Sequence, residues 1–210
     1  MSDNKPDYLN GSVNDFIAAT AAKQSTPGGG SVAAVVGALG VALAEMTLNF
    51  TRGKKKYAEH EPLYEEVGGR FAKARALFGQ LMTDDMEAFT LYQQAQKMPD
   101  GTDKDQAMDV ATASAVNVPR ETAKLTLAMM EDMHRLAGKA NPYLISDLVA
   151  GAALAVAVTK LCDYNVRVNL AYVKDQDAAA DLRVASRTDV AKASNLLAEI
   201  EAAAKDQLGP

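Results

Sequence analysis

The hydrophobic positions along this chain repeat with the period of an α-helix. Apolar residues recur at intervals of three and four, and no stretch alternates apolar and polar residues between hairpin turns as a strand would. We therefore predict an all-α protein, a bundle of long antiparallel helices, with residues 1–210 in a single domain. The expected helices cover about 13–23, 31–51, 62–97, 103–117, 119–137 and 141–174, and a last helix begins near Asp177.

Proline is expected to interrupt one of these patterns. Pro119 lies between the segments 103–117 and 119–137. A proline has no backbone N–H, and its ring collides with the preceding helical turn. The sequence therefore predicts a break or a kink at this position.

The helices expected at 31–51 and 141–174 are rich in alanine and glycine. Small side chains let two backbones approach closely, so these helices are expected to pair at the centre of the bundle. Each small residue buries little area, which favours many contacts along long helices and a homodimer or a higher homo-oligomer. The longest apolar runs, 32–44 and 148–158, span 13 and 11 residues. Because a bilayer span needs roughly 18 or more, they are predicted to be buried helices without membrane contact.

The amino-acid composition excludes several classes of protein. Hydrophobic residues make up 48% of the 210 positions and charged residues 23%, which are globular values. The single cysteine excludes an intrachain disulfide, and with two histidines it leaves few ligands for a metal. A net charge of -5 argues against broad nucleic-acid binding. Because we find no secretory signal at the N-terminus, we expect a cytoplasmic protein. The composition leads us to expect neither a metal nor a nucleic-acid partner.

A glycine-rich loop, Thr26-Pro27-Gly28-Gly29-Gly30-Ser31, opens directly onto an apolar helix. Unhindered amides at a helix N-terminus favour an anion or a carbonyl oxygen, so the loop could bind a ligand. The alternative is an ordinary helix-entry loop, which is common.

Two charged segments are candidates for chemistry. Arg52 and Lys54-Lys55-Lys56 form a basic patch in an acidic protein, which suits either a small anionic ligand or a solvated loop or dimer contact. Asp85 lies on the apolar side of its helix, near Leu81 and Phe89. A carboxylate beside apolar neighbours tends toward a raised pKa and can act as a general acid or base. The alternative is a half-exposed aspartate within a helix.

Other polar residues are less specific. Asn141, Ser146 and Asp147 lie at an expected helix start, where Asp147 could simply satisfy backbone N–H groups. Asn165 and Asn169 share one helix face, which suits a polar notch or solvent exposure. The chain has no phosphate-binding loop, dinucleotide fingerprint, nucleophile elbow or zinc-protease motif.

In this order and spacing, the motifs resemble the cyclodeaminase/cyclohydrolase family over nearly the whole chain. That family includes methenyltetrahydrofolate cyclohydrolases and the cyclodeaminase domain of formiminotransferase-cyclodeaminase. The resemblance implies a dimeric all-α fold that binds tetrahydrofolate derivatives without a metal or redox cofactor. It is carried by Thr26-Pro27-Gly28-Gly29-Gly30-Ser31, Asn49-x-Thr51-x-Gly53-Lys54-Lys55-Lys56-Tyr57, Asp84-Asp85-x-Glu87-Ala88-Phe89, Val118-Pro119, Asn141-x4-Ser146-Asp147 and Asn165-x3-Asn169.

The same resemblance assigns roles by position. Asp85 matches the acid/base carboxylate of the cyclodeaminase domain. Lys54 and Lys55 match basic positions, and Lys56 matches the lysine form of a motif that is not basic in every cyclodeaminase. The remaining positions assigned to a substrate pocket are Pro27, Gly28, Gly29, Gly30, Ser31, Asn141 and Asp147.

The expected reaction is the hydrolysis of 5,10-methenyltetrahydrofolate to 10-formyltetrahydrofolate. Asp85 would take a proton from water, or Lys56 would do so if it were desolvated and crowded by Lys54 and Lys55, which would make it lose its proton more readily. The lysines and Arg52 would hold the carboxylates of a folate tail, which is expected to be polyglutamylated. The alternatives are cyclisation of 5-formiminotetrahydrofolate with release of ammonia, and a helical protein that binds folate without turnover.

Overall fold

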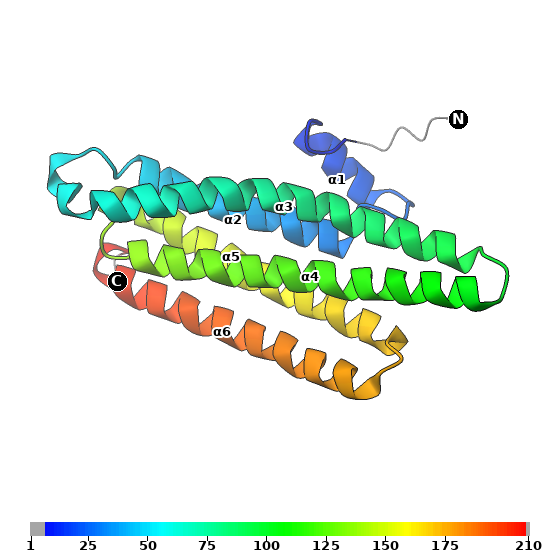
Figure 1. Cartoon of the computed structure of the whole chain (residues 1–210). Helices are drawn as coiled ribbons and strands as arrows, with labels where there is room; N and C mark the ends of the chain where they lie inside the picture. The colour runs from blue at the N-terminus through cyan, green and yellow to red at the C-terminus, as the bar shows by residue number, and fades with distance from the viewer. Residues whose placement is uncertain (1–6, 209–210) are drawn as a thin grey trace.

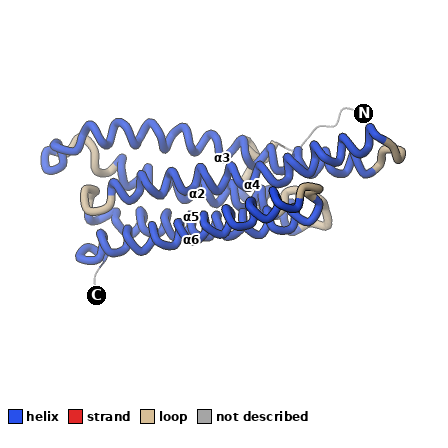
Figure 2. Tube along the Cα trace, turned by 60° about the horizontal axis from the view of Figure 1, so that its bottom comes forward, coloured by secondary structure: helices blue, strands red, loops and turns tan. Residues whose placement is uncertain are grey.

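The computed structural model describes residues 7–208, and every long element in that part of the chain is a helix. Figure 1 shows long helices lying side by side, with the short first helix slanting outside them, above α3. Figure 2 shows the loops that join them. The all-α prediction is confirmed. The α-helices are α1 (Val13–Ala21), α2 (Gly29–Asn49), α3 (Glu61–Gln96), α4 (Thr102–Leu136), α5 (Ile145–Asn169) and α6 (Gln176–Leu208), and the short 3-10 helices are η1 (Lys55–His60), η2 (Pro142–Leu144) and η3 (Leu170–Tyr172).

Helices α2 and α5 pair at the centre of the bundle, as their small residues predicted. Their backbones meet at two glycines, because a Cβ atom on Gly151 would lie 2.6 Å from the carbonyl oxygen of Gly40. A Cβ atom on Gly37 would likewise lie 2.6 Å from the ring of Phe78 on α3. Glycine at these positions therefore sets how closely α2 approaches both neighbours.

Larger side chains from α3 and α4 fill the space around this central pair. Tyr64, Phe71 and Phe78 on α3 are almost completely buried, as are Met130 and Met133 on α4. Helix α1 contributes no buried residue. The core therefore belongs to the long helices, and α1 lies outside it.

The sequence predicted a break or a kink at Pro119, and the break is wrong. Helix α4 runs without interruption from Thr102 to Leu136, and Pro119 is buried inside it. An ordinary residue at position 119 would donate its N–H to the carbonyl oxygen of Ala115. Here the side-chain Nδ2 of Asn169 on α5 donates to that oxygen at 2.8 Å. A neighbouring helix thus supplies the donor that proline lacks, and packing along the whole length holds α4 together.

The central helices are apolar on their outward side as well. Helix α2 and the segment Pro142–Tyr172 each reach a mean hydropathy of 1.8, long and apolar enough by composition to cross a membrane. Half of the apolar stretch of α2 is buried inside the protein, and 44% of the other. Buried core helices share these properties, and the absence of membrane contact stays a prediction.

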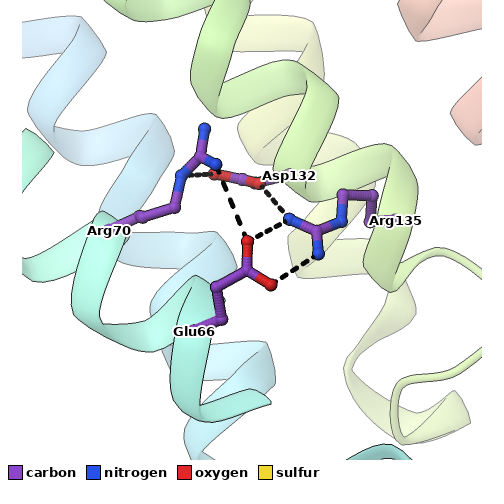
Figure 3. Close-up of polar contacts among 4 residues, drawn as sticks. All are labelled: Glu66, Arg70, Asp132 and Arg135. Atoms are coloured by element: carbon purple, nitrogen blue, oxygen red, sulfur yellow. Dashed lines mark hydrogen bonds and ion pairs between the residues drawn. The ribbon is translucent and has the colours of Figure 1, made fainter. Parts of the chain in front are cut away.

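An ion-pair network joins α3 to α4 at a distance from the cavity described below. Arg135 binds both carboxylate oxygens of Glu66 at 2.8 Å and one oxygen of Asp132 at 3.1 Å. Arg70 lies 2.8 Å from the other oxygen of Asp132, whose side chain is only 1% exposed (Figure 3). Two guanidinium groups thus surround one buried carboxylate.

Candidate functional site

A cavity of about 380 Å³ opens at the N-terminal end of α2. Its walls come from the glycine-rich loop, from α3, α4 and α5, and from η3. Segments that are far apart in the sequence therefore meet around one space. The lining residues are Ser25, Thr26, Gly28, Gly29, Gly30, Asp85, Ala88, Phe89, Tyr92, Ala115, Asn165, Val168, Asn169 and Tyr172.

Asp85 of α3 lies directly against the first turn of α2. The hydroxyl of Ser31, which is completely buried, donates a hydrogen bond to Asp85 Oδ2 at 2.7 Å. A Cβ atom on Gly30 would collide with the Asp85 carboxylate. Glycine at position 30 therefore allows this carboxylate to reach the helix start, where unpaired N–H groups and the helix dipole favour a negative charge.

The surroundings of Asp85 favour its neutral form more than water does. Burial raises the pKa of the Asp85 carboxyl above the ordinary value, and hydrogen bonds from the Ser31 side chain and backbone oppose this increase. A carboxyl with a raised pKa can both accept and return a proton near neutral pH. The structure places Asp85, partly buried, beside Ala88 and Phe89, and its role as an acid or base stays a prediction.

Cys162 lies close enough to Asp85 for the charge of Asp85 to affect the pKa of the Cys162 thiol. Burial, and secondarily the negative charge of Asp85, raise the pKa of the Cys162 thiol to about 12. The thiol is therefore protonated at neutral pH and is a poor nucleophile. It packs with Ala33, Ala123 and Val158 as a small apolar side chain.

Two asparagines of α5 form the wall near the glycine loop. Nδ2 of Asn165 donates to the carbonyl oxygen of Leu161 at 2.8 Å, and Asn169 donates to Ala115 as described above. A Cβ atom on Gly29 would lie 3.4 Å from Asn165 Nδ2, so the loop packs against this side chain. The shared face of Asn165 and Asn169 is therefore a polar wall of the cavity.

Three aromatic side chains complete the cavity and were not predicted as site residues. Phe89 and Tyr92 follow Asp85 by four and seven positions, a spacing that places them on the same helix face. The ring centroid of Tyr92 lies 6.2 Å from that of Tyr172 in η3. The helical spacing could have identified Phe89 and Tyr92, whereas the position of Tyr172 depends on how α5 ends.

The structure brings only part of the predicted site together. Gly28, Gly29 and Gly30 line the cavity with Asp85. Ser31 lies behind the wall and contacts Asp85, and Pro27 is buried in the same loop without lining the cavity. The loop and the carboxylate thus meet in one crevice of a single chain.

The remaining predicted residues lie at the opposite end of α2, as Figure 1 shows for the loop between α2 and α3. Helix α2 has 21 residues and is about 30 Å long, which separates this group from the cavity within one chain. The side chains of Lys54, Lys55 and Lys56 are exposed, so one chain does not provide the desolvation that would favour Lys56 as a base. Asp147 lies in the first turn of α5 at the same end.

Asn141 also belongs to this second group. Its backbone N–H donates to Thr51 Oγ1 at 2.9 Å, and its Nδ2 donates to the carbonyl oxygen of Phe50 at 3.3 Å. Its Oδ1 accepts from the N–H of Tyr143 at 3.3 Å. Within one chain, Asn141 therefore joins the start of α5 to the end of α2. Its role in substrate binding stays a prediction.

The fold and cavity define an all-helical protein that matches one family model, described as formiminotransferase-cyclodeaminase, over residues 12–188. The chain belongs to the formiminotransferase-cyclodeaminase family, which confirms the resemblance carried by the motifs.

Named relatives and a solved structure support this membership. The chain is 31% identical to the methenyltetrahydrofolate cyclohydrolase of Methylorubrum extorquens over 177 residues, which cover 82% of this chain and 85% of that protein. It is 32% identical to the mouse formimidoyltransferase-cyclodeaminase, covering 80% of this chain but 32% of that longer protein. The crystal structure of formiminotetrahydrofolate cyclodeaminase from Thermotoga maritima aligns with a TM-score of 0.88 and 29% identity, over 96% of this chain and 99% of that one.

Proposed function

We propose that this protein is an enzyme of tetrahydrofolate one-carbon metabolism that hydrolyses 5,10-methenyltetrahydrofolate to 10-formyltetrahydrofolate. The observation that carries this proposal is the Asp85 carboxylate, which lines the cavity at the start of α2. The similarity to a cyclohydrolase over most of both chains supports the choice of reaction.

The positive charge of the substrate suits the Asp85 carboxylate, which forms no ion pair with another side chain among residues 7–208. The methenyl bridge is an amidinium-like cation, so a negative Asp85 attracts it and stabilises charge near the reacting carbon. Water adds to the bridging carbon while Asp85 accepts one water proton. When the bond between that carbon and N5 breaks, Asp85 returns a proton to N5. The second proton of the added water leaves to solvent, and the formyl group remains on N10.

The second candidate is the cyclisation of 5-formiminotetrahydrofolate, and the Thermotoga structure favours it. Here N10 attacks the formimino carbon, the N10 proton moves to the terminal nitrogen, and the bond from the carbon to that nitrogen breaks. Asp85 in its protonated form, which its raised pKa favours, would give a second proton to the same nitrogen, which leaves as ammonia. The same cavity would therefore serve either reaction.

Supplying the two substrates separately distinguishes these reactions. Methenyl absorbance is expected to fall when 5,10-methenyltetrahydrofolate is added to the protein. An increase in methenyl absorbance together with ammonia release from 5-formiminotetrahydrofolate would favour the cyclodeaminase. Folate binding without either change would identify a non-catalytic binding protein.

We further propose a homodimer in which each cavity is completed by the lysine-bearing end of the second copy. The outward face of the α2 and α5 pair is apolar, with Leu39 56% exposed and Leu154 partly exposed beside it. A two-fold axis across the middle of α2 would pair these faces in antiparallel directions. Lys54, Lys55 and Lys56 of one copy would then lie near the Gly28–Gly30 loop of the other, where they could hold a polyglutamate tail.

Mixed dimers test this arrangement. Asp85→Asn chains and Lys54→Gln/Lys55→Gln chains are unfolded together, refolded, and assayed at low substrate concentration. If the site is shared, a mixed dimer contains one intact site, and an equal mixture should regain about a quarter of the wild-type rate, because half of the dimers are mixed. If each site belongs to one chain, the mixture should show only the average of the two variants, about a tenth of the wild-type rate, because the lysine variant keeps its kcat and has a KM raised about fivefold.

A further inference from the structure

Pro119 leaves one backbone carbonyl without its helical partner, and that carbonyl lies at the cavity. Residue 119 cannot donate an N–H, so the oxygen of Ala115 has no helical donor four residues later. Ala115 itself lines the cavity with Asp85. The oxygen accepts instead from Asn169 Nδ2 at 2.8 Å.

This contact fixes the orientation of the Asn169 amide. A carbonyl oxygen can only accept, so the nitrogen of Asn169 must face Ala115 and its Oδ1 must face away from that carbonyl. Within residues 7–208, no hydrogen bond occupies Asn169 Oδ1. Because Asn169 lines the cavity, this oxygen is available to accept from a ligand.

Asn165 is oriented in a similar way but by a different kind of carbonyl. Its Nδ2 donates to the oxygen of Leu161, which lies inside the uninterrupted helix α5. Asn165 therefore needs no proline to hold it. With the Asp85 carboxylate, the two asparagine oxygens give the cavity three acceptors, which suit a ligand edge that carries N–H donors.

We infer that Pro119 is a positioning residue: it frees the Ala115 carbonyl, which then orients the Asn169 amide. In this orientation the side-chain oxygens of Asn169 and Asn165 accept hydrogen bonds from the N–H groups of a pterin ring. The inference rests on the proposed function for the identity of the ligand. The orientation of Asn169 depends only on contacts within the chain.

A pair of double-mutant cycles tests whether Pro119 acts through Asn169. In Pro119→Ala, the new N–H at position 119 competes for the Ala115 oxygen, so kcat/KM for the folate substrate should fall about tenfold, mostly through KM. Asn169→Ala should cause a similar loss, and the double variant should be no worse than Asn169→Ala alone. Pro119→Ala should fold, because alanine is the better helix former.

Asn165 provides the matched control. The losses from Pro119→Ala and Asn165→Ala should add, because Pro119→Ala does not change the Leu161 carbonyl to which Asn165 donates. Losses that add in both cycles would overturn the inference, since Pro119 would then act through the general shape of α4. An unchanged KM in Pro119→Ala would also overturn it.

Side-chain amide signals in nitrogen-15 NMR spectra give a readout without any ligand. The Asn169 signal is assigned by its loss in Asn169→Ala. In Pro119→Ala it should shift and exchange its protons faster, while the Asn165 signal stays in place. An unmoved Asn169 signal overturns the positioning role. A moved signal supports positioning even if the wild-type protein turns over no folate, in which case the proposed function is wrong.

Discussion

Asp85 on α3 and Asp132 on α4 are two carboxylates in the same bundle with different electrostatic partners. Burial raises the pKa of both. At Asp132, Arg70 at 2.8 Å and Arg135 at 3.1 Å oppose that effect with two positive charges (Figure 3). At Asp85 only hydrogen bonds from Ser31 oppose it, and within residues 7–208 no ion pair joins this carboxylate to a Lys, Arg or His side chain.

The difference separates a structural charge from a functional one. The charge of Asp132 is neutralised by protein groups from two helices, which makes it part of the contact between α3 and α4. The charge of Asp85 lies at the wall of a cavity, where a cationic ligand can act as its counter-ion. We therefore expect the loss of Asp132 to affect folding and the loss of Asp85 to affect turnover.

The largest expected effect is that of Asp85→Asn on turnover. Asparagine keeps the size of the side chain but cannot take a proton from water, so kcat should fall at least about a hundredfold with little change in KM. Steady-state hydrolysis followed by methenyl absorbance measures this loss. Wild-type kcat in the variant would remove Asp85 from the mechanism.

The same variant should not be less stable. Because the pKa of Asp85 is raised in the folded state, ionising this carboxyl costs stability. The neutral carboxyl makes its full contribution to stability at pH values below the unfolded pKa, and this contribution is lost as the pH rises through the folded pKa. At neutral pH, Asp85→Asn should therefore unfold at equal or higher urea concentration than wild type. This result would separate loss of chemistry from loss of fold.

Asp132→Asn should produce the opposite pattern. Burial raises the pKa of Asp132 as well, so losing its charge is not what destabilises this variant. Asparagine instead replaces one acceptor oxygen by an NH2 donor that faces Arg70 or Arg135, so the free energy of unfolding should fall by about 2 kcal/mol. Urea unfolding measures the loss, and kcat of the folded protein should stay close to that of wild type. Glu131→Gln is the matched control, since it removes an exposed ion pair with Lys192 and should cost less.

Sequence patterns predicted most of the fold because its causes are local. Helical periodicity defined the long helices, and α1 begins with a capping box that Ser12 and Asp15 form within one turn. The predicted break at Pro119 was wrong because a rule based on neighbouring residues includes only the missing N–H of proline. It does not include Asn169, which lies on another helix and donates to the freed carbonyl. That compensation depends on tertiary packing, which no local pattern contains.

The candidate site was predictable to the extent that its residues lie near one helix end. Asp85 and the glycine loop meet, as their residue types suggested. The lysines follow the loop by only two dozen residues, yet α2 carries the chain about 30 Å away between them. The contributions of Ala115 and Tyr172 depend on where α4 and α5 pass the cavity, which the sequence does not specify.

A smaller effect is expected from charges that contact the tail of the substrate. Lys54→Gln/Lys55→Gln should raise KM about fivefold for a polyglutamylated folate and less for a monoglutamate, with kcat retained, because these groups bind the substrate and do not react. Added salt should reduce the difference between variant and wild type. Lys73→Gln, which changes an exposed lysine on α3, is the control. A lower kcat with unchanged KM would instead place a lysine in the reaction.

The smallest effect tests the one group that opposes the raised pKa of Asp85. Removing the Ser31 hydroxyl in Ser31→Ala takes away a hydrogen bond to the charged carboxylate, so the pKa of Asp85 should rise further. For a general base, kcat/KM falls as the pH drops through this pKa, and the acid limb of the profile should therefore move to higher pH. At a fixed pH on this acid limb, the loss should be about twofold to threefold. Ser186→Ala removes a similar bond to Asp163 and should leave the profile unchanged. An acid limb that stays in place in Ser31→Ala would mean that another group controls it, and Asp85 would no longer differ from Asp132 in the way proposed.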